Sequence, residues 1–166
     1  MNTHKFLYLM RHAKSDWSDW WCRDYDRWLN ARWKRDLKEF VPIVAEKIGV
    51  VDLLISSGAK RTRKTANACA KHLGYKKSGI QLDDTIYESG RDEVVMTMKK
   101  IPHHYANVLL VGHNPALNEF IQWCRVDCDN LPTAWVVCFE YLADDRAVLT
   151  PALLEFQWIE FPKKLR

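Results

Sequence analysis

Three short segments of the sequence place basic and imidazole side chains directly after apolar runs. They read FLYLMRHAKS, SSGAKRTRKTA and VGHNP, and the side chains that could do chemistry in them are Arg11, His12, Arg61 and His113. Adjacent cations repel one another, and a cation in the first turn of a helix opposes the helix dipole by roughly 0.3–1 kcal/mol. A tetrahedral anion bound among these side chains would offset both costs, because guanidinium groups pair strongly with such anions. The three segments together therefore indicate an anion site.

Each segment alone has an ordinary explanation. An Arg-His pair after a strand is often a surface feature, KRTRK could be the solvated basic face of a helix, and GHNP could be a turn with a hydrogen-bonded histidine. Three such segments at the ends of three strands are a much less ordinary combination. Proteins with open α/β sheets bind ligands beyond the carboxyl ends of the strands, often against helix N-termini, and we expect the three segments to meet there.

The elements that would bring these segments together alternate between strand and helix along the chain. Apolar runs predict strands, and apolar residues at helical spacing between them predict helices. The alternation predicts an α/β fold of three layers, α/β/α, in which a mostly parallel sheet carries helices on both faces. Pro42 is expected to kink or divide the first helix. Strands are expected at residues 5–10, 50–57 and 79–84, within 106–115, and at 133–142 and 152–161, and helices at 32–48, from 60 to about 74, at 90–101 and around 117–124.

Length and composition predict a single domain, residues 1–166, in which residues 16–31 form a lid-like insertion without a clean period. The net charge of +4 suits an anionic substrate but is too small to indicate nucleic-acid binding by itself. Five cysteines without C-x-x-C spacing favour neither a zinc site nor a disulfide framework, and they fit a reducing, cytoplasmic location. No apolar run approaches the roughly 18 residues of a membrane span, and the N-terminus does not have the pattern of a signal peptide.

The combination of segments resembles the histidine phosphatase superfamily, whose fold is phosphoglycerate mutase-like. The likeness is strongest to its small bacterial branch, the SixA-type phosphohistidine phosphatases. That branch typically shows LYLVRHAKS-W, D-DRPLN-RG, SSPAKRA-QTA, VGHNP and a late LPTA. This chain carries LYLMRHAKSDW, DYDRWLNARW, SSGAKRTRKTA, VGHNP and LPTA in the same order. The resemblance covers nearly the whole length.

The resemblance implies a role for each of the four side chains. His12 would be the nucleophile that takes up the phosphoryl group, and Arg11, Arg61 and His113 would surround its oxygens. Phosphoryl transfer depends mainly on positioning and on stabilisation of charge, so fixed guanidinium donors suit it. The resemblance implies neither a metal nor a cofactor. Glu88, in IYESG, is the candidate proton donor to the leaving group, the alternative being a solvated loop carboxylate, and Lys14, Ser15 and Asn114 are candidate substrate-binding residues at the pocket edge.

The resemblance also implies a substrate class, phosphohistidine on a protein. One alternative is a phosphatase for small phosphomonoesters. A second is a phosphoprotein-binding module without turnover, although binding alone would not require His12. A third, a nucleic-acid-binding protein that uses the tryptophans and arginines of residues 17–35, has no recognised motif in its favour. No membrane partner is expected.

Several positions depart from the family pattern. Gly58 replaces a proline and is expected to loosen its turn, while Ala13 keeps the small side chain that the site needs. Trp28 and Trp33 replace a proline and a glycine, which leaves the conformation of that segment open. Five tryptophans lie within residues 17–33. They could form an aromatic rim for a partner protein or a base-bearing substrate, or a lid folded on its own aromatic side chains.

Overall fold

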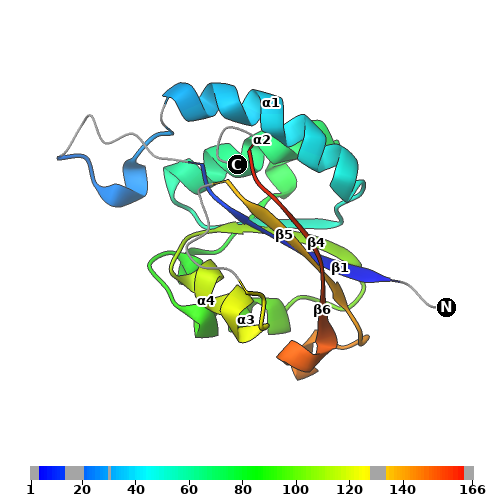
Figure 1. The fold of residues 1–166 in the computed structure, drawn as a ribbon. Helices are drawn as coiled ribbons and strands as arrows, with labels where there is room; N and C mark the ends of the chain where they lie inside the picture. The colour runs from blue at the N-terminus through cyan, green and yellow to red at the C-terminus, as the bar shows by residue number, and fades with distance from the viewer. Residues whose placement is uncertain (1–3, 14–20, 30, 128–133, 163–166) are drawn as a thin grey trace.

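The computed structural model describes residues 4–13, 21–29, 31–127 and 134–162, and in them a mixed sheet lies between two layers of helices (Figure 1). The strand order of this six-stranded sheet is β3-β2-β4-β1-β5-β6. The neighbours β3-β2, β2-β4 and β4-β1 pair in parallel, and β1-β5 and β5-β6 pair antiparallel. The strands are β1 (Lys5–Arg11), β2 (Leu53–Ser56), β3 (Gln81–Leu82), β4 (Asn107–Gly112), β5 (Val136–Tyr141) and β6 (Leu154–Glu160).

The helices cover both faces of the sheet, which confirms the three-layer α/β prediction (Figure 1). Alternate residues along β1 point to opposite faces, so Leu7 and Leu9 belong to one core and Tyr8 and Met10 to the other. The first core is filled from α3 and α4, and the second from α1 and α2. The helices are α1 (Ala31–Ile48), α2 (Lys60–Leu73), α3 (Arg91–Lys99) and α4 (Ala116–Trp123).

Two local predictions differ from the structure. The strands β2 and β3 are shorter than the expected ranges 50–57 and 79–84. Pro42 does not divide the first helix: α1 continues through it, with Val41 and Val44 buried against the sheet on either side. The alternative, a kink at Pro42, stays a prediction. Burial of this apolar face offsets the backbone hydrogen bond that a proline removes. At the end of α2, Gly74 adopts the left-handed conformation (φ 67°) that commonly terminates a helix.

The parallel strands bring the three basic segments to one edge of the sheet. Arg11 at the end of β1 lies beside Gly112 at the end of β4, and Ser56 at the end of β2 lies beside Val111. The helix α2 begins four residues after β2, which places Arg61 in its first turn. Within the described ranges, no helix is long and apolar enough to cross a membrane.

Candidate active site

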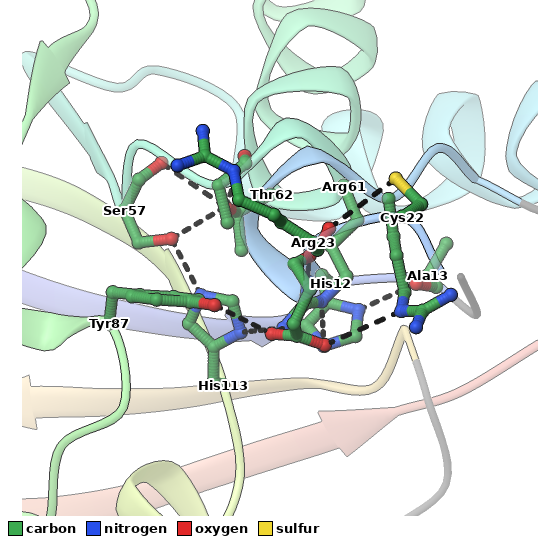
Figure 2. Close-up of polar contacts among 12 residues, drawn as sticks. His12, Ala13, Cys22, Arg23, Ser57, Arg61, Thr62, Tyr87 and His113 are labelled. Atoms are coloured by element: carbon green, nitrogen blue, oxygen red, sulfur yellow. Dashed lines mark hydrogen bonds and ion pairs between the residues drawn. The ribbon is translucent and has the colours of Figure 1, made fainter. Parts of the chain in front are cut away.

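Side chains from three separate segments meet at the carboxyl ends of β1, β2 and β4 (Figure 2). The rings of His12 and His113 have their centroids 5.0 Å apart. Arg61 reaches both rings, with Nε 3.3 Å from Nε2 of His12 and Nη2 3.4 Å from Nδ1 of His113. All three are buried, with exposed fractions of 8%, 7% and 6% for His12, Arg61 and His113. These predicted residues therefore surround a common point.

The hydrogen bonds of His12 define its tautomer. Its Nδ1 lies 2.6 Å from the backbone carbonyl oxygen of Ala13, which can only accept, so Nδ1 carries the proton. The Nε2 atom consequently holds the lone pair, and Nε–H of Arg61 points at it. The backbone at this contact is held in place by a further hydrogen bond, in which the Ala13 N–H donates to Oγ1 of Thr65 on α2. His12 therefore presents an unprotonated nitrogen to the pocket.

A chain of hydroxyl groups defines the tautomer of His113. Its Nε2 lies 2.6 Å from Oγ of Ser57, which lies 2.6 Å from Oγ1 of Thr62 (Figure 2). Thr62 uses its single proton on backbone carbonyl oxygens, the shorter contact being 2.8 Å to Ala59. Ser57 must then donate to Thr62 and accept from Nε2–H of His113. Nδ1 of His113 is left as an acceptor, which agrees with the Arg61 guanidinium facing it.

Burial and neighbouring cations keep both imidazoles neutral. Burial is the main reason that the pKa of His12 lies well below 6.5, and His113, Arg61 and Arg11 lower this pKa further, against the Ala13 carbonyl. Burial and then Arg61 lower the pKa of His113 to about 3, against the opposing effect of Asp24. The pKa of Arg11 is lowered by burial and by Arg61. This crowding of positive charge is what an anion would relieve.

Asp24 and Tyr87 also contact the site, and the sequence analysis did not identify them. The Asp24 backbone carbonyl accepts from Nη1 of Arg61 at 2.6 Å, and its Oδ2 accepts from Nη2 at 2.9 Å. The hydroxyl of Tyr87 donates to the same carboxylate at 2.7 Å, and its ring meets that of His113 edge-on at 5.4 Å. The sequence offered a signal for both residues. Asp24 begins the DYDRWLNARW segment of the family pattern, and Tyr87 directly precedes the candidate proton donor Glu88.

The carboxyl group of Asp24 is held in its charged form. Burial raises its pKa, but hydrogen bonds from Tyr87 and Arg61 and the charge of Arg61 outweigh burial, so the pKa lies below 3.8. Burial and the hydrogen bond to Asp24 raise the pKa of Tyr87 to about 12. A negative charge from the chain itself therefore lies against Arg61.

Two of the remaining predicted site residues, Glu88 and Asn114, are among the residues that the structure describes. Glu88 is exposed, and it adopts a positive φ of 47° immediately after Tyr87. Asn114 is half-buried, and its Oδ1 accepts the N–H of Asn118 at 3.1 Å in the first turn of α4. Lys14 and Ser15 lie outside the described residues. In the part of the chain that is described, no group of three or more His, Cys, Asp or Glu side chains could hold a metal ion.

Gly58 ties its turn to the segment that carries Asp24. Its N–H donates to Oδ1 of Asp84 at 2.9 Å, and the hydroxyl of Tyr25 donates to the same oxygen at 3.0 Å. A Cβ atom at residue 58 would overlap both the Tyr25 hydroxyl and the Asp84 carboxylate. The turn is therefore held by specific contacts, and the expectation that Gly58 loosens it relative to a proline stays a prediction.

Comparison with protein families identifies the superfamily of the chain. A family model described as the histidine phosphatase superfamily (branch 1) matches residues 7–110, a range that contains His12 and Arg61. An uncharacterized chloroplastic protein of Arabidopsis thaliana is 26% identical over 121 residues, which are 68% of this chain and 56% of that protein. The chain thus spans little more than half the length of this curated relative.

Solved structures share the fold along nearly the whole chain. A candidate phosphohistidine phosphatase SixA from Nakamurella multipartitia superposes with a TM-score of 0.81 at 24% identity, covering 98% of both chains. A protein histidine phosphatase SixA complexed with tungstate gives 0.79 at 14% identity, covering 97% of this chain and 99% of that one. A phosphoglycerate mutase from Bacillus anthracis gives 0.69 at 13%, covering 93% and 92%. The fold is therefore phosphoglycerate mutase-like.

Proposed function

The chain belongs to branch 1 of the histidine phosphatase superfamily, and we propose that this phosphatase hydrolyses phosphohistidine on a protein through a phosphoenzyme intermediate on His12. The observation that carries the proposal is the lone pair on Nε2 of His12, fixed by the Ala13 carbonyl and facing Nε–H of Arg61, in a ring whose centroid lies 5.0 Å from that of His113. The likeness of the fold to SixA structures supports phosphohistidine as the substrate class.

In the first step, Nε2 of His12 attacks the phosphorus atom of the substrate. A nitrogen–phosphorus bond forms at His12 while the bond to the substrate nitrogen breaks, and the leaving imidazole takes up a proton from water or from Glu88, the proposed donor. Arg61 and Arg11 stabilise the charge on the transferring oxygens, because their guanidinium donors are positioned before the reaction begins. His113 adds a donor once the bound anion has raised its pKa and the ring has gained a proton. His12 can act as the nucleophile without losing a proton, since its pKa lies well below 6.5.

In the second step, water attacks the phosphorus atom of phospho-His12. The new bond between oxygen and phosphorus forms as the bond to Nε2 breaks, which restores the lone pair. The water oxygen and its protons leave with the inorganic phosphate. Throughout both steps Nδ1–H stays hydrogen-bonded to the Ala13 carbonyl, so the ring keeps one orientation.

Glu88 is the proposed proton donor for leaving groups that need one, and Lys14, Ser15 and Asn114 stay the proposed substrate-binding residues. Asp24 lies closer to Arg61, but its lowered pKa makes it a poor acid at neutral pH. A phosphoramidate leaving group needs less help from an acid than an alkoxide does. We therefore expect Glu88→Gln to slow phosphomonoester hydrolysis more than phosphohistidine hydrolysis, and equal effects on both would exclude this role.

The second candidate is a phosphatase of the same superfamily that acts on small phosphomonoesters. It differs from the first candidate because it would need no contacts with a substrate protein. The test compares purified wild type, His12→Ala and, as a matched control, the exposed His72→Ala on a phosphohistidine protein and on a phosphomonoester. We expect His12→Ala alone to lose activity and the phosphohistidine protein to be the better substrate. Hydrolysis that survives in His12→Ala would falsify the nucleophile assignment, and a clear preference for the ester would favour the second candidate.

Arg61 has a test of its own in the same assay. Arg61→Ala removes a guanidinium that lies within hydrogen-bond distance of both imidazoles. Loss of one such transition-state donor is expected to lower kcat by roughly 10²-fold or more. Arg91→Ala, at an exposed position on α3, is the control for a change of net charge. A wild-type rate in Arg61→Ala would remove Arg61 from the proposed machinery.

A further inference from the structure

The outer face of α2 carries a row of basic side chains beside the candidate site. Lys60, Arg63 and Lys64 recur at helical spacing, while Arg61 and Thr62 are turned inward and buried. The same three cations line a groove of about 270 Å³ between α2 and the edge strand β3. Apolar side chains, Ile80 and the exposed Leu82, line the groove as well, and Lys77 adds a further cation.

Trp28 gathers three of the neighbouring lysines around one indole ring. The Nζ atoms of Lys60, Lys64 and Lys34 lie 3.5, 5.0 and 5.6 Å from the ring centroid. The ring is 45% exposed. Cation–π contacts hold the three ammonium groups close together without neutralising them. The Trp28 ring therefore forms part of a surface with a concentrated positive charge.

The basic side chains around Trp28 and in the groove have no carboxylate partner among the residues that the structure describes. Other surface cations do have one: Lys47 pairs with Glu160, and Arg23 with Asp26. Arg63 lacks such a pair in the described part of the chain, and its buried Nε has no hydrogen-bond partner there. We call Trp28, Lys34, Lys60, Arg63 and Lys64 the basic face. Its charge is unbalanced within the described chain, which favours an external anionic partner.

The basic face is continuous with the candidate site. Lys60 directly precedes Arg61, and Trp28 follows the Asp24 turn that contacts the Arg61 guanidinium. His12 and His113 are buried, so a phosphohistidine must enter the pocket side chain first. The protein surface around that phosphohistidine then has to lie on the rim of the site, and the basic face is part of this rim.

We propose that the basic face docks an acidic surface that surrounds the phosphohistidine of the substrate protein. The inference rests on the proposed function and adds what kind of partner the phosphatase selects. Apolar Ile80 and Leu82 in the groove and the exposed Trp28 ring fit a protein surface, which mixes apolar and charged groups. A nucleic acid would be matched by a longer track of cations, whereas these side chains are confined to the start of α2 and its neighbours.

The test uses three synthetic peptides of equal length, each with one phosphohistidine, flanked by acidic, neutral or basic residues. Values of kcat/KM are measured for wild type and for Lys60→Glu/Lys64→Glu, with free phosphoramidate as an internal reference. Lys99→Glu/Lys100→Glu, at the end of α3 on the opposite face of the sheet, is the matched control. The assays are run at about 50 and about 300 mM salt, where exposed charges are screened to different degrees.

We expect wild type to prefer the acidic peptide by about tenfold over the basic one at low salt, with less preference at high salt. In Lys60→Glu/Lys64→Glu the preference should disappear or reverse, while free phosphoramidate is hydrolysed as by wild type. The control variant should behave as wild type. Such a reversal would raise kcat/KM for the basic peptide above its wild-type value, which damage to the fold would not do.

Hydrolysis of all three peptides at equal rates would overturn the docking inference and leave the proposed function standing. If no phosphohistidine peptide is hydrolysed, the proposed function is wrong and the inference fails with it. A single-stranded oligonucleotide that displaces the acidic peptide at 300 mM salt, through Lys60 and Lys64, would show instead that the basic face is a nucleic-acid surface.

Discussion

At the scale of single residues, the two imidazoles of the site are opposite tautomers. His12 carries its proton on Nδ1 and offers Nε2 to the pocket, whereas His113 carries its proton on Nε2 and offers Nδ1. His113 can therefore donate to a phosphate oxygen only after it gains a proton. A bound dianion would raise the pKa of His113 from about 3, so anion binding and proton uptake should be linked.

Ser57 provides a test of the His113 tautomer. Ser57→Ala removes the acceptor of Nε2–H, so we expect nitrogen NMR of the neutral ring to show loss of a single tautomer. One neutral hydrogen bond is worth about 1 kcal/mol, so kcat should fall roughly fivefold to tenfold. Ser56→Ala is the control, since its buried hydroxyl donates to the Ser57 carbonyl and does not contact His113. An unchanged tautomer in Ser57→Ala would contradict the assignment.

At the scale of elements, the short turn η1 (Asp24–Asp26) brings its own negative charge to Arg61. The turn is joined to the far side of the site by Tyr25, which reaches Asp84, and by Tyr87, which reaches Asp24. These contacts link residues about sixty positions apart. A substrate phosphate that binds Arg61 must either displace the Asp24 carboxylate or lie beside it.

Asp24→Asn should therefore strengthen the binding of inorganic phosphate or tungstate. Two like charges about 4 Å apart repel by about 1 kcal/mol in water and by about 4 kcal/mol at an effective dielectric constant of about 20, so we expect at least fivefold tighter binding. Calorimetric titration measures the effect. Asp26→Asn is the matched control, because that carboxylate pairs with Arg23 in the same turn. Weaker anion binding in Asp24→Asn would mean that Asp24 serves chiefly to position Arg61.

Gly58→Ala tests how the turn η1 is held. The added Cβ would overlap the Tyr25 hydroxyl and the Asp84 carboxylate, so one or both must move. We expect faster hydrogen exchange in residues 21–29 and a free energy of unfolding lower by about 1–3 kcal/mol, the usual cost of overpacking. Gly79→Ala is the control, since its Cβ would meet Tyr75 at an ordinary 3.4 Å. Unchanged exchange in residues 21–29 would show that these contacts do not hold the segment.

At the scale of the whole molecule, burial of neutral histidines links stability to pH. The pKa of His113 falls from 6.5 unfolded to about 3 folded, and that of His12 is also lowered, so below pH 6.5 the unfolded chain binds more protons. The free energy of unfolding should then decrease as the pH falls from about 6.5 towards 3. Denaturant titrations of His113→Asn should show a weaker decrease than wild type between pH 6.5 and 4.5. An identical slope would contradict the assigned pKa.

The fold could be predicted because its signals are local to each element. Apolar runs that end in Arg11, Ser56 and Gly112 indicated the strands, and their alternation with helices indicated the layers. The convergence of His12, Arg61 and His113 also followed, since parallel strands bring their carboxyl ends to one edge. The single domain, the cytoplasmic location and the metal independence stay predictions.

What the sequence did not reveal depends on contacts between distant segments. Asp24 and Tyr87 are sixty-three positions apart, so no spacing rule connects them. Nothing in the sequence shows why residue 58 must be a glycine. In the structure, Tyr25 and Asp84 occupy the space that a side chain at this position would need. The position of the Trp28 ring among lysines of two helices also became visible only in the structure. The lid-like insertion at 16–31 lies partly outside the described residues.

The central claim is that Nε2 of His12 carries the phosphoryl group between two steps. The most direct measurement is rapid quenching of wild-type enzyme with a phosphohistidine peptide, followed by mass spectrometry and phosphorus NMR of the trapped protein. The account predicts one phosphoryl group per chain, on Nε2 of His12, and none in His12→Ala. A phosphoryl group on Nδ1 or on another residue, or full turnover with no trapped intermediate in either protein, would contradict it.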